Sequence, residues 1–208
     1  MLNKTIKYVV VAIVVLLAAY NSVYFRKLDE VKAAANKQFN AAAYAKNYLN
    51  TKLNPSVSTL TGIDSLINSI KTAKASAFST YGHALDIGNI RYFMTKGTGV
   101  VTNIDESDVY VLTPGKLTIK IATEYVFGNA LRDASGLIKV NDFSNTADLN
   151  NISSEVNKII RTTILPSFKS SVKKGDKVDF AGAFELNSAH MNLDNIELIP
   201  FQLKIDRQ

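Results

Sequence analysis

The stretch "RYFMTKGTGVVTNI", Arg91 to Ile104, decides the fold of this chain. It is rich in β-branched and aromatic residues, and apolar positions recur along it with the period of two that is typical of a β-strand. Gly97 and Gly99 interrupt the pattern, and glycine inside a strand indicates a bulge or a sharp bend. We therefore expect one long strand that bends at its two glycines.

The segments after this strand continue the β pattern and break it once with a helix. The predicted elements are strands over 108–113 and 116–123, a helix over 152–165 that ends at Pro166, and strands over 176–186 and 195–205. The order strand, strand, strand, helix, strand, strand is that of the OB-fold, a Greek-key barrel with a helix between its third and fourth strands. We therefore expect an α+β protein whose residues 89–208 form a small OB-like antiparallel β-barrel.

Two helices are expected before the barrel. Residues 28–53 are rich in Ala, contain no Pro or Gly, and place apolar residues at three- and four-residue steps. The "NPS" at Asn54–Ser56 is expected to end this helix. A second helix is predicted over 63–81, with Gly82 as its C-terminal cap. The short link between them indicates a helical hairpin, and residues 28–88 are assigned to it.

A long apolar run, "YVVVAIVVLLAAYNSVYF" (Tyr8–Phe25), lies near the N-terminal end and contains no charged residue. As a helix it would span roughly 27 Å, which is just enough for the core of a bilayer. A buried core helix is the least favoured interpretation, because basic residues flank the run on both sides. A cleaved signal peptide is the alternative, although the bulky Tyr20 directly after Ala18-Ala19 does not suit a cleavage site.

We favour an uncleaved signal-anchor over residues 1–27. The short N-terminal tail with Lys4 and Lys7 is the side expected in the cytoplasm. The expected partner of residues 8–25 is therefore the bacterial inner membrane, crossed once, with the C-terminal domain in the periplasm.

The net charge of +6 does not indicate a nucleic-acid-binding protein. Four of the 24 basic residues flank the apolar run, and no acidic residue precedes Asp29, so the rest of the chain is nearly balanced by its 18 acidic residues. OB-folds that bind nucleic acid stack bases on aromatic side chains over a basic groove. The strand aromatics have few basic neighbours here, and we assign them to the core or the barrel lining: Tyr92, Phe93, Tyr110, Phe180 and Phe184.

Motifs for catalysis and for cofactors are absent from the sequence. The chain has no cysteine, which excludes disulfides, thiol nucleophiles and cysteine-bound metals. His83 and His190 each lack a second ligand at metal-binding spacing, so no metal site is expected. The "KGTGVV" segment at 96–101 interrupts a strand and does not open a helix, as a phosphate loop would. We expect no enzyme activity and no cofactor.

One polar stretch, "FGNALRDASGLIKVNDFSN" (Phe127–Asn145), is the candidate binding loop. An arginine offers a fork of donors for ligand oxygens, and Asn and Asp side chains are common in sites for small polar ligands such as sugars. The alternative, which we favour, is a structural corner whose Asn and Asp residues form turns. Arg132 and Asp133 would face opposite sides of a strand, so different partners are expected for them. The candidate residues are Asn129, Arg132, Asp133, Asn141, Asp142 and Asn145.

The chain after the apolar run resembles a family of predicted bacterial periplasmic lipoproteins of unknown function. The string "GNALRDASG" followed by "NDFSN" is the most specific part of the resemblance. The full set is "YAKNYLNTKLNP" (44–55), "KGTGVV" (96–101), "GNALRDASG" (128–136), "NDFSN" (141–145) and "GAF" (182–184).

The resemblance implies a single N-terminal membrane attachment, a periplasmic domain, and an association with operons for sugar uptake. It implies no established activity and no catalytic residues. This chain departs from the family in lacking the cysteine that would carry a lipid, which favours a helical anchor, and in having Thr146 after "NDFSN" where Gln is expected.

Two functions are compatible with these observations. The first is a membrane-tethered periplasmic accessory protein without catalysis, which binds a transporter or a binding-protein partner of an uptake system. The second is a periplasmic binding protein for a sugar or polyol that uses the 127–145 loop.

Overall fold

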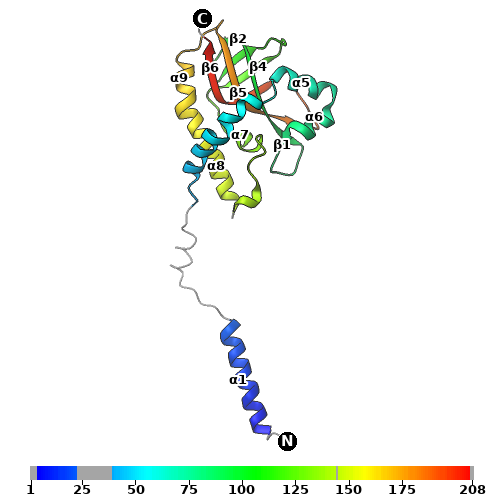
Figure 1. Cartoon of the computed structure of the whole chain (residues 1–208), viewed down its shortest axis with the longest axis vertical. Helices are drawn as coiled ribbons and strands as arrows, with labels where there is room; N and C mark the ends of the chain where they lie inside the picture. Colours follow the sequence, from blue (N-terminus) through cyan, green and yellow to red (C-terminus); the bar gives the residue numbers. More distant parts are fainter. Residues whose placement is uncertain (1–3, 23–38, 144, 207–208) are drawn as a thin grey trace. The chain divides into compact units, whose positions relative to one another are not determined.

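The structure, a computed structural model, describes residues 4–22, 39–143 and 145–206. The chain divides into two compact units, Met1–Phe39 and Asn40–Gln208, each described by itself. In the first unit, α1 (Lys4–Ser22) covers most of the predicted anchor, and residues 23–27 of that prediction lie outside the described part of the chain (Figure 1). Among the described residues, no helix combines the length and the apolar character needed to cross a membrane.

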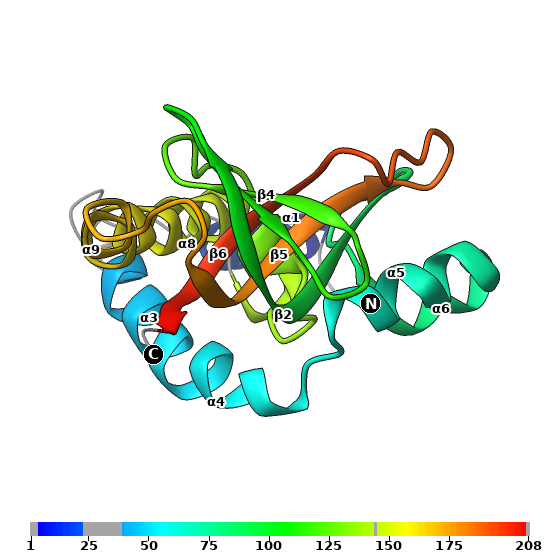
Figure 2. The ribbon, with the colours of Figure 1, turned by 90° about the horizontal axis from the view of Figure 1, so that it is seen from above.

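The second unit is built around a closed β-barrel (Figure 2). Antiparallel ladders join β2 to β3, β3 to β4 and β5 to β6, while β4 and β6 are parallel. Pairing of β2 with β5 closes the barrel. The strands of the described chain are β1 (Gly82–His83), β2 (Ile90–Ile104), β3 (Asp108–Leu112), β4 (Thr118–Ala122), β5 (Lys177–Asn187) and β6 (Ile196–Asp206). The predicted OB-like barrel is confirmed, but it is not antiparallel throughout, because β4 and β6 pair in parallel. The short β1 beside β2 was not predicted.

The two glycines of β2 allow close approach of other groups to this strand. A Cβ atom on Gly99 would lie 2.5 Å from the carbonyl oxygen of Leu112 on β3, and one on Gly97 would lie equally close to an aromatic ring atom. Such separations are too short for a real Cβ contact. Position 99 therefore requires glycine, because its neighbour is backbone, and a side chain at position 97 would displace the ring of Phe180. The predicted irregularity of this strand lies a little further along, where the register with β3 shifts between Val101 and Asn103.

The barrel interior is aromatic at its centre. The rings of Phe93 and Phe184, which are cross-strand partners, stack with centroids 5.4 Å apart. Phe78 packs edge-on against Phe93 at 5.0 Å. Tyr92 is only half-buried, because successive side chains of a strand face opposite sides. Other buried residues of this core are Ile63, Leu66, Ile67, Ile70, Val101, Val111, Ile119, Ile121, Val178, Phe180 and Leu198.

The helix predicted over 63–81 is divided in two. α5 (Ile63–Thr72) and α6 (Lys74–Tyr81) meet at Ala73, whose φ of −143° and ψ of 58° are not helical. Gly82 is the C-terminal cap of α6, as predicted, and donates its backbone N–H to the carbonyl oxygen of Phe78; its backbone is extended, with a φ of −91°, and it begins β1. The break lets α5 pack on β2 while α6 leads directly into the sheet.

Two helices continue through proline, where we predicted that they would end. α3 (Ala41–Tyr48) passes through a π-helical turn, η1 (Leu49–Leu53), into α4 (Asn54–Ser56) and the 3₁₀ turn η2 (Val57–Thr59). In the same way α8 (Thr146–Ile159) passes through η4 (Ile160–Ile164) into α9 (Leu165–Lys169).

The π-helical turns explain this continuation. In each, the residue before proline donates its backbone N–H to a carbonyl five residues back: Asn54 to Leu49, and Leu165 to Ile160. A proline in a regular α-helix clashes with the carbonyl four residues before it and removes one hydrogen bond. The wider turn gives that carbonyl another position, so the helix is not broken.

Residues 28–38 of the predicted helical hairpin (28–88) lie outside the described part of the chain, and the described remainder does not form a hairpin. α3 packs against α8, and α5 and α6 pack against each other and against β2. Figure 2 shows α8 and α9 on one side of the barrel and α5 and α6 on the other. The residues from 40 to 88 therefore belong to the same compact unit as the strands.

Candidate functional site

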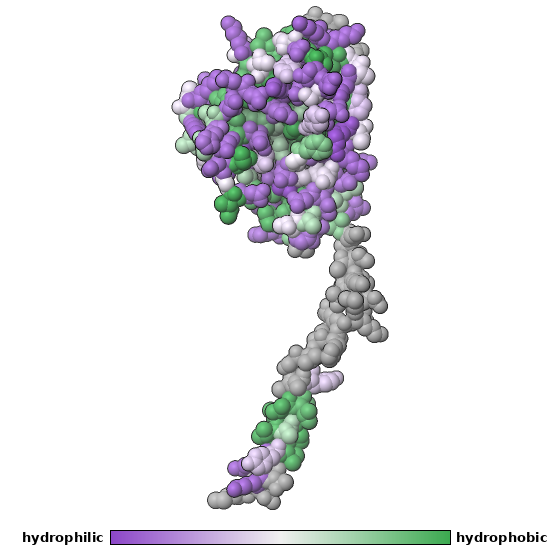
Figure 3. Space-filling view, turned by 180° about the vertical axis from the view of Figure 1, so that it is seen from behind, coloured by the Kyte–Doolittle hydropathy of each residue, from purple (hydrophilic) through white to green (hydrophobic). Residues whose placement is uncertain are grey.

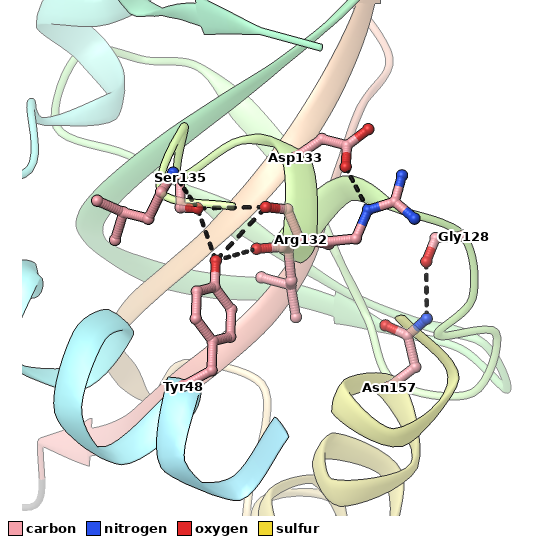
Figure 4. Close-up of polar contacts among 8 residues, drawn as sticks. Tyr48, Gly128, Arg132, Asp133, Ser135 and Asn157 are labelled. Carbon is pink, nitrogen blue, oxygen red and sulfur yellow. Dashed lines mark hydrogen bonds and ion pairs between the residues drawn. The ribbon is translucent and has the colours of Figure 1, made fainter. Parts of the chain in front are cut away.

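The candidate loop begins with a short helix, α7 (Ala130–Asp133), that is tied to α3 by one tyrosine (Figure 4). The buried hydroxyl of Tyr48 donates to the carbonyl oxygen of Leu131 at 3.0 Å and lies 2.7 Å from the hydroxyl of Ser135. Burial is the largest cause that raises the pKa of Tyr48 above its ordinary value of 10.0. The phenol therefore remains a neutral donor, and it fixes α7 over the end of α3.

Two side chains of the α8–η4 helix tie down the start of the same loop. Asn157, which is buried, donates from Nδ2 to the carbonyl oxygen of Gly128 at 2.9 Å (Figure 4). Arg161 donates to the carbonyl oxygen of Val126. Gly128 has a φ of +79°, a conformation that favours glycine, so the loop turns sharply where Asn157 holds it.

Arg132 and Asp133 form a buried ion pair, with Nε of Arg132 2.5 Å from Oδ1 of Asp133. Arg132 is only 4% exposed, and the side chain of Asp133 is fully inaccessible. Our expectation that the two residues have different partners was wrong. They lie on a helical turn and not on a strand, so the two side chains do not diverge to opposite faces of a sheet.

The pair leaves several polar atoms without a protein partner. Oδ2 of Asp133 is buried and accepts no hydrogen bond in the described part of the chain. Only the Nε group of Arg132 donates to another described residue, so its two terminal Nη groups have no acceptor there. A guanidinium group in this state still offers its outer donors in a fixed planar arrangement.

Arg132 borders a cavity with a volume of about 570 Å³. Its walls come from the loop after β1, from α7 and the residue before it, from the 3₁₀ turn η3 (Val140–Asp142), and from the first turns of α8. The polar lining offers amide, hydroxyl and carboxylate groups beside the guanidinium, and the rest is aliphatic. The lining residues are Leu85, Asp86, Ile87, Asn129, Arg132, Val140, Thr146, Leu149 and Asn150.

The predicted site residues fall into two groups. Asn129 and Arg132 line the cavity, with Asp133 directly behind Arg132. Asn141 and Asp142 are exposed on η3 and do not line it. The side chain of Asn145 accepts from the backbone N–H of Asp148 and caps the N-terminus of α8, as the structural alternative predicted.

Sequence reasoning missed the wall contributed by Leu85, Asp86 and Ile87. This loop lies more than 40 residues before Arg132 in the chain, and no local pattern connects the two. One signal was available: Ile87 is an aliphatic residue among Asp, Gly and Asn, and it is fully exposed in the structure. An exposed apolar residue at a loop tip has no role in the core.

The family model described as "Predicted periplasmic lipoprotein (DUF2291)" matches residues 13–204. The chain belongs to this family. The predicted resemblance is thereby confirmed, and with it a periplasmic protein of unknown function. No curated protein matches the chain in sequence.

Among solved structures, the chain is similar to an OB-fold protein from Thermotoga maritima, with a TM-score of 0.70 and 24% sequence identity. The similarity covers 81% of this chain and 99% of the other. At this identity the similarity shows the fold alone, and it agrees with the closed barrel described above.

Three of the sequence strings that carry the family resemblance meet at this corner of the fold. Tyr48 of the string at 44–55 contacts Leu131 and Ser135 of the string at 128–136. The ring of Tyr44, also in the string at 44–55, packs edge-on against Phe143 of the string at 141–145, with centroids 5.6 Å apart. The family pattern therefore marks the α3–α7–η3 corner, at which the Arg132 cavity lies.

Among the described residues, no group of three or more His, Asp or Glu side chains is placed to hold a metal ion.

Proposed function

We propose that this member of the family is a membrane-tethered periplasmic accessory protein, without catalytic activity, that binds a peptide segment of a protein partner in the Arg132 cavity. One observation carries the proposal. Arg132 is almost inaccessible, is fixed through Nε by Asp133, and keeps its outer donors unused at the wall of the cavity. A buried arginine whose donors serve only the fold would have acceptors for them.

The lining supports a peptide as the occupant. The guanidinium and the side chains of Asn129 and Asn150 can bond to backbone carbonyl and N–H groups. The aliphatic wall, which includes Leu85 and Leu149, suits an apolar side chain. Two of the apolar lining residues, Ile87 and Val140, are also exposed to solvent, as at a surface that another protein covers.

A small oxygen-rich ligand, such as a sugar or polyol, is the second candidate. The cavity volume lies within the range of roughly 300–1,000 Å³ that such ligands occupy. The partner is favoured because the lining contains no aromatic ring among the described residues, whereas apolar side chains are prominent. A component of a sugar-uptake system, which the family resemblance implies, is the partner that we propose to test first.

Attachment through the apolar run at residues 8–25 is part of the same proposal. The chain has no cysteine that could carry a lipid. In Figure 3 the middle of α1 presents a continuous apolar surface, and its aliphatic side chains from Val9 to Leu17 are exposed. Exposed aliphatic side chains on one helix are stabilised by transfer to an apolar environment. The test is extraction: the full chain should stay with membranes after an alkaline carbonate wash, and residues 28–208 behind a cleavable leader should not.

Photo-crosslinking in living cells tests the proposed binding surface. A photo-reactive benzoylphenylalanine is placed at position 87, where full exposure makes it compatible with the fold, and at position 106 in the β2–β3 turn as a control. A discrete protein adduct is expected at position 87 and not at position 106. The additional change Asn150→Arg, which fills the cavity from an exposed position of α8, should abolish the adduct.

Thermal unfolding of the full chain with a panel of sugars and polyols tests the second candidate. A ligand at a hundred times its dissociation constant adds about 2.7 kcal/mol, or about 5–10 °C in a domain of this size. A shift of this size that is lost in Asn150→Arg would support a small ligand, and not a protein partner, as the occupant of the Arg132 cavity. Equal adducts at positions 87 and 106, with no ligand shift, would contradict both candidates.

A further inference from the structure

A second cavity, lined by aromatic rings and carboxylates, lies on the outer side of the barrel next to α7. Its volume is about 280 Å³. Asn129 lines both this cavity and the Arg132 cavity, but the other walls differ. The side chains that define it are Tyr92 of β2, Tyr125 and Phe127 of the loop after β4, Glu185 of β5 and Glu197 of β6.

The aromatic walls of this cavity have no evident role in folding. Tyr125 is 65% exposed and Phe127 is 61% exposed, although both are next to residues that are firmly packed. Phe127 is nevertheless held in place, because the guanidinium of Arg161 lies 5.0 Å from its ring centroid and also donates to the neighbouring Val126 carbonyl. Exposed rings in fixed positions are typical of a binding surface.

The two carboxylates face this cavity without an ion-pair partner in the described part of the chain. Lys120 is the cross-strand neighbour of Glu197, but its ammonium group lies over the ring of Tyr110, 5.7 Å from the centroid. Burial first, then repulsion by Asp108 and Glu185, raises the pKa of Glu197. Burial first, then the negative charges of Glu185, Asp133 and Asp86, raises the pKa of Tyr92.

We propose that this cavity is a second binding site, which takes an organic ammonium ion. The single positive charge of an ammonium group would be attracted by both Glu185 and Glu197, would reduce the repulsion between them, and would lie against the electron-rich faces of the aromatic rings. A volume of about 280 Å³ accommodates a group of the size of choline or the end of a lysine side chain. The site does not depend on the function proposed for the Arg132 cavity.

The test is an NMR titration of the ¹⁵N-labelled full chain in detergent with choline chloride. The matched probe is 3,3-dimethylbutan-1-ol, which has the shape of choline without its charge, and the amide of Nα-acetyl-lysine tests whether a peptide lysine is taken as well. Choline should produce saturable shifts centred on residues 125–130, 185 and 197. The neutral probe should bind at least about tenfold more weakly, which is the effect of a cation–π contact and two carboxylates at a partly exposed site.

Variants assign the effect to the proposed groups. Glu197→Gln and Glu185→Gln should each weaken choline binding by about fivefold or more, whereas Glu106→Gln, in the exposed β2–β3 turn, should leave it unchanged. If only the lysine amide binds tightly, the proposal of an ammonium site holds, and the ammonium group comes from a lysine of a peptide. Equal binding of choline and its neutral analogue, shifts that do not saturate, or equal effects of the Glu197 and Glu106 variants would overturn the proposal.

Discussion

Arg132 and Asp133 are adjacent in the sequence and are also bonded to each other, with Nε and Oδ1 2.5 Å apart in a buried part of the fold. Asp133 holds the guanidinium through its Nε atom and does not bond to the two Nη groups. Because α3 holds α7 through Tyr48 and α8 holds the preceding turn through Asn157, the pair cannot easily rotate away from the cavity. The same residues thus make a rigid corner and present unused donors.

Breaking the pair should destabilise the protein strongly. Asp133→Leu and Arg132→Met each leave one buried charge without its partner, which costs about 3–5 kcal/mol. The double variant Arg132→Met/Asp133→Leu removes both charges and should recover most of that loss. Urea unfolding of the four proteins measures the coupling. The exposed pair of Glu155 and Lys158 provides the control, since Glu155→Gln should change stability by less than about 1 kcal/mol.

Removing the hydroxyl of Tyr48 should loosen the same corner. Tyr48→Phe deletes the bond to the Leu131 carbonyl and the contact with Ser135, and we expect a loss of about 1–3 kcal/mol because the remaining groups are buried. Tyr110→Phe removes a hydrogen bond to exposed Asp105 and should cost clearly less than Tyr48→Phe. Equal effects of the two substitutions would show that Tyr48 does not anchor α7.

Glycine 99 should tolerate no side chain. Gly99→Ala places a methyl group 2.5 Å from the backbone oxygen of Leu112, which cannot move without disturbing the β2–β3 ladder, and should cost about 1–3 kcal/mol. Gly62→Ala is the control. It has no atom within 4 Å of its added Cβ and an ordinary φ of −63°, so thermal unfolding should show a change of at most about 1 kcal/mol. A tolerated Gly99→Ala would contradict the close approach of β2 to β3.

Glu197 should make stability depend on pH in an unusual direction. Its pKa in the folded protein is raised above 4.5 by burial, by Asp108 and by Glu185, against the attraction of Lys120. Its stabilising contribution is therefore complete below pH 4.5 and is lost as the pH rises through the folded pKa. The free energy of unfolding of Glu197→Gln, minus that of the natural protein, should be larger at pH 7 than at pH 4. Urea unfolding of both proteins at the two pH values measures this difference.

Glu124 provides a control of opposite sign. Its hydrogen bond and ion pair with Lys169 lower its pKa, so its contribution is present above 4.5 and is lost as the pH falls through the folded value. Glu124→Gln should therefore be less stable than the natural protein at pH 7, and the difference should shrink towards low pH. The same trend with pH in both variants would contradict the assignment for Glu197.

The strands were predictable because their signal is local. The alternation of apolar residues within a strand and the turn residues between strands are patterns among neighbouring residues. The glycines of β2 indicated where other groups approach this strand closely. The helices were less predictable, because Pro55 and Pro166 end a regular α-helix and the π-helical turns that accommodate them have no sequence signal that we used. The partner of α3 depends on packing between segments 100 residues apart.

The site was predictable only in part. Asn129 and Arg132 were expected in it, but α7 is too short to show a helical period, so the Arg132–Asp133 pair was missed. Asn145 looked like a ligand residue because the side chains that cap helices and those that bind ligands are the same types. The carboxylates of the second cavity lie on β5 and β6, far from the loop in sequence, and only the barrel brings them beside Phe127.

Hydrogen exchange of the Arg132 side chain, measured by NMR on protein labelled with ¹⁵N-arginine, shows directly whether its outer donors are unused. The Nε–H proton, bonded to buried Asp133, should exchange slowly, whereas the Nη protons at the cavity should exchange rapidly with water. Nη protons as strongly protected as the Nε proton would show that the fold uses every donor of Arg132. The Arg132–Asp133 pair would then serve only to stabilise the fold, and the proposal that the cavity is a binding site would be contradicted.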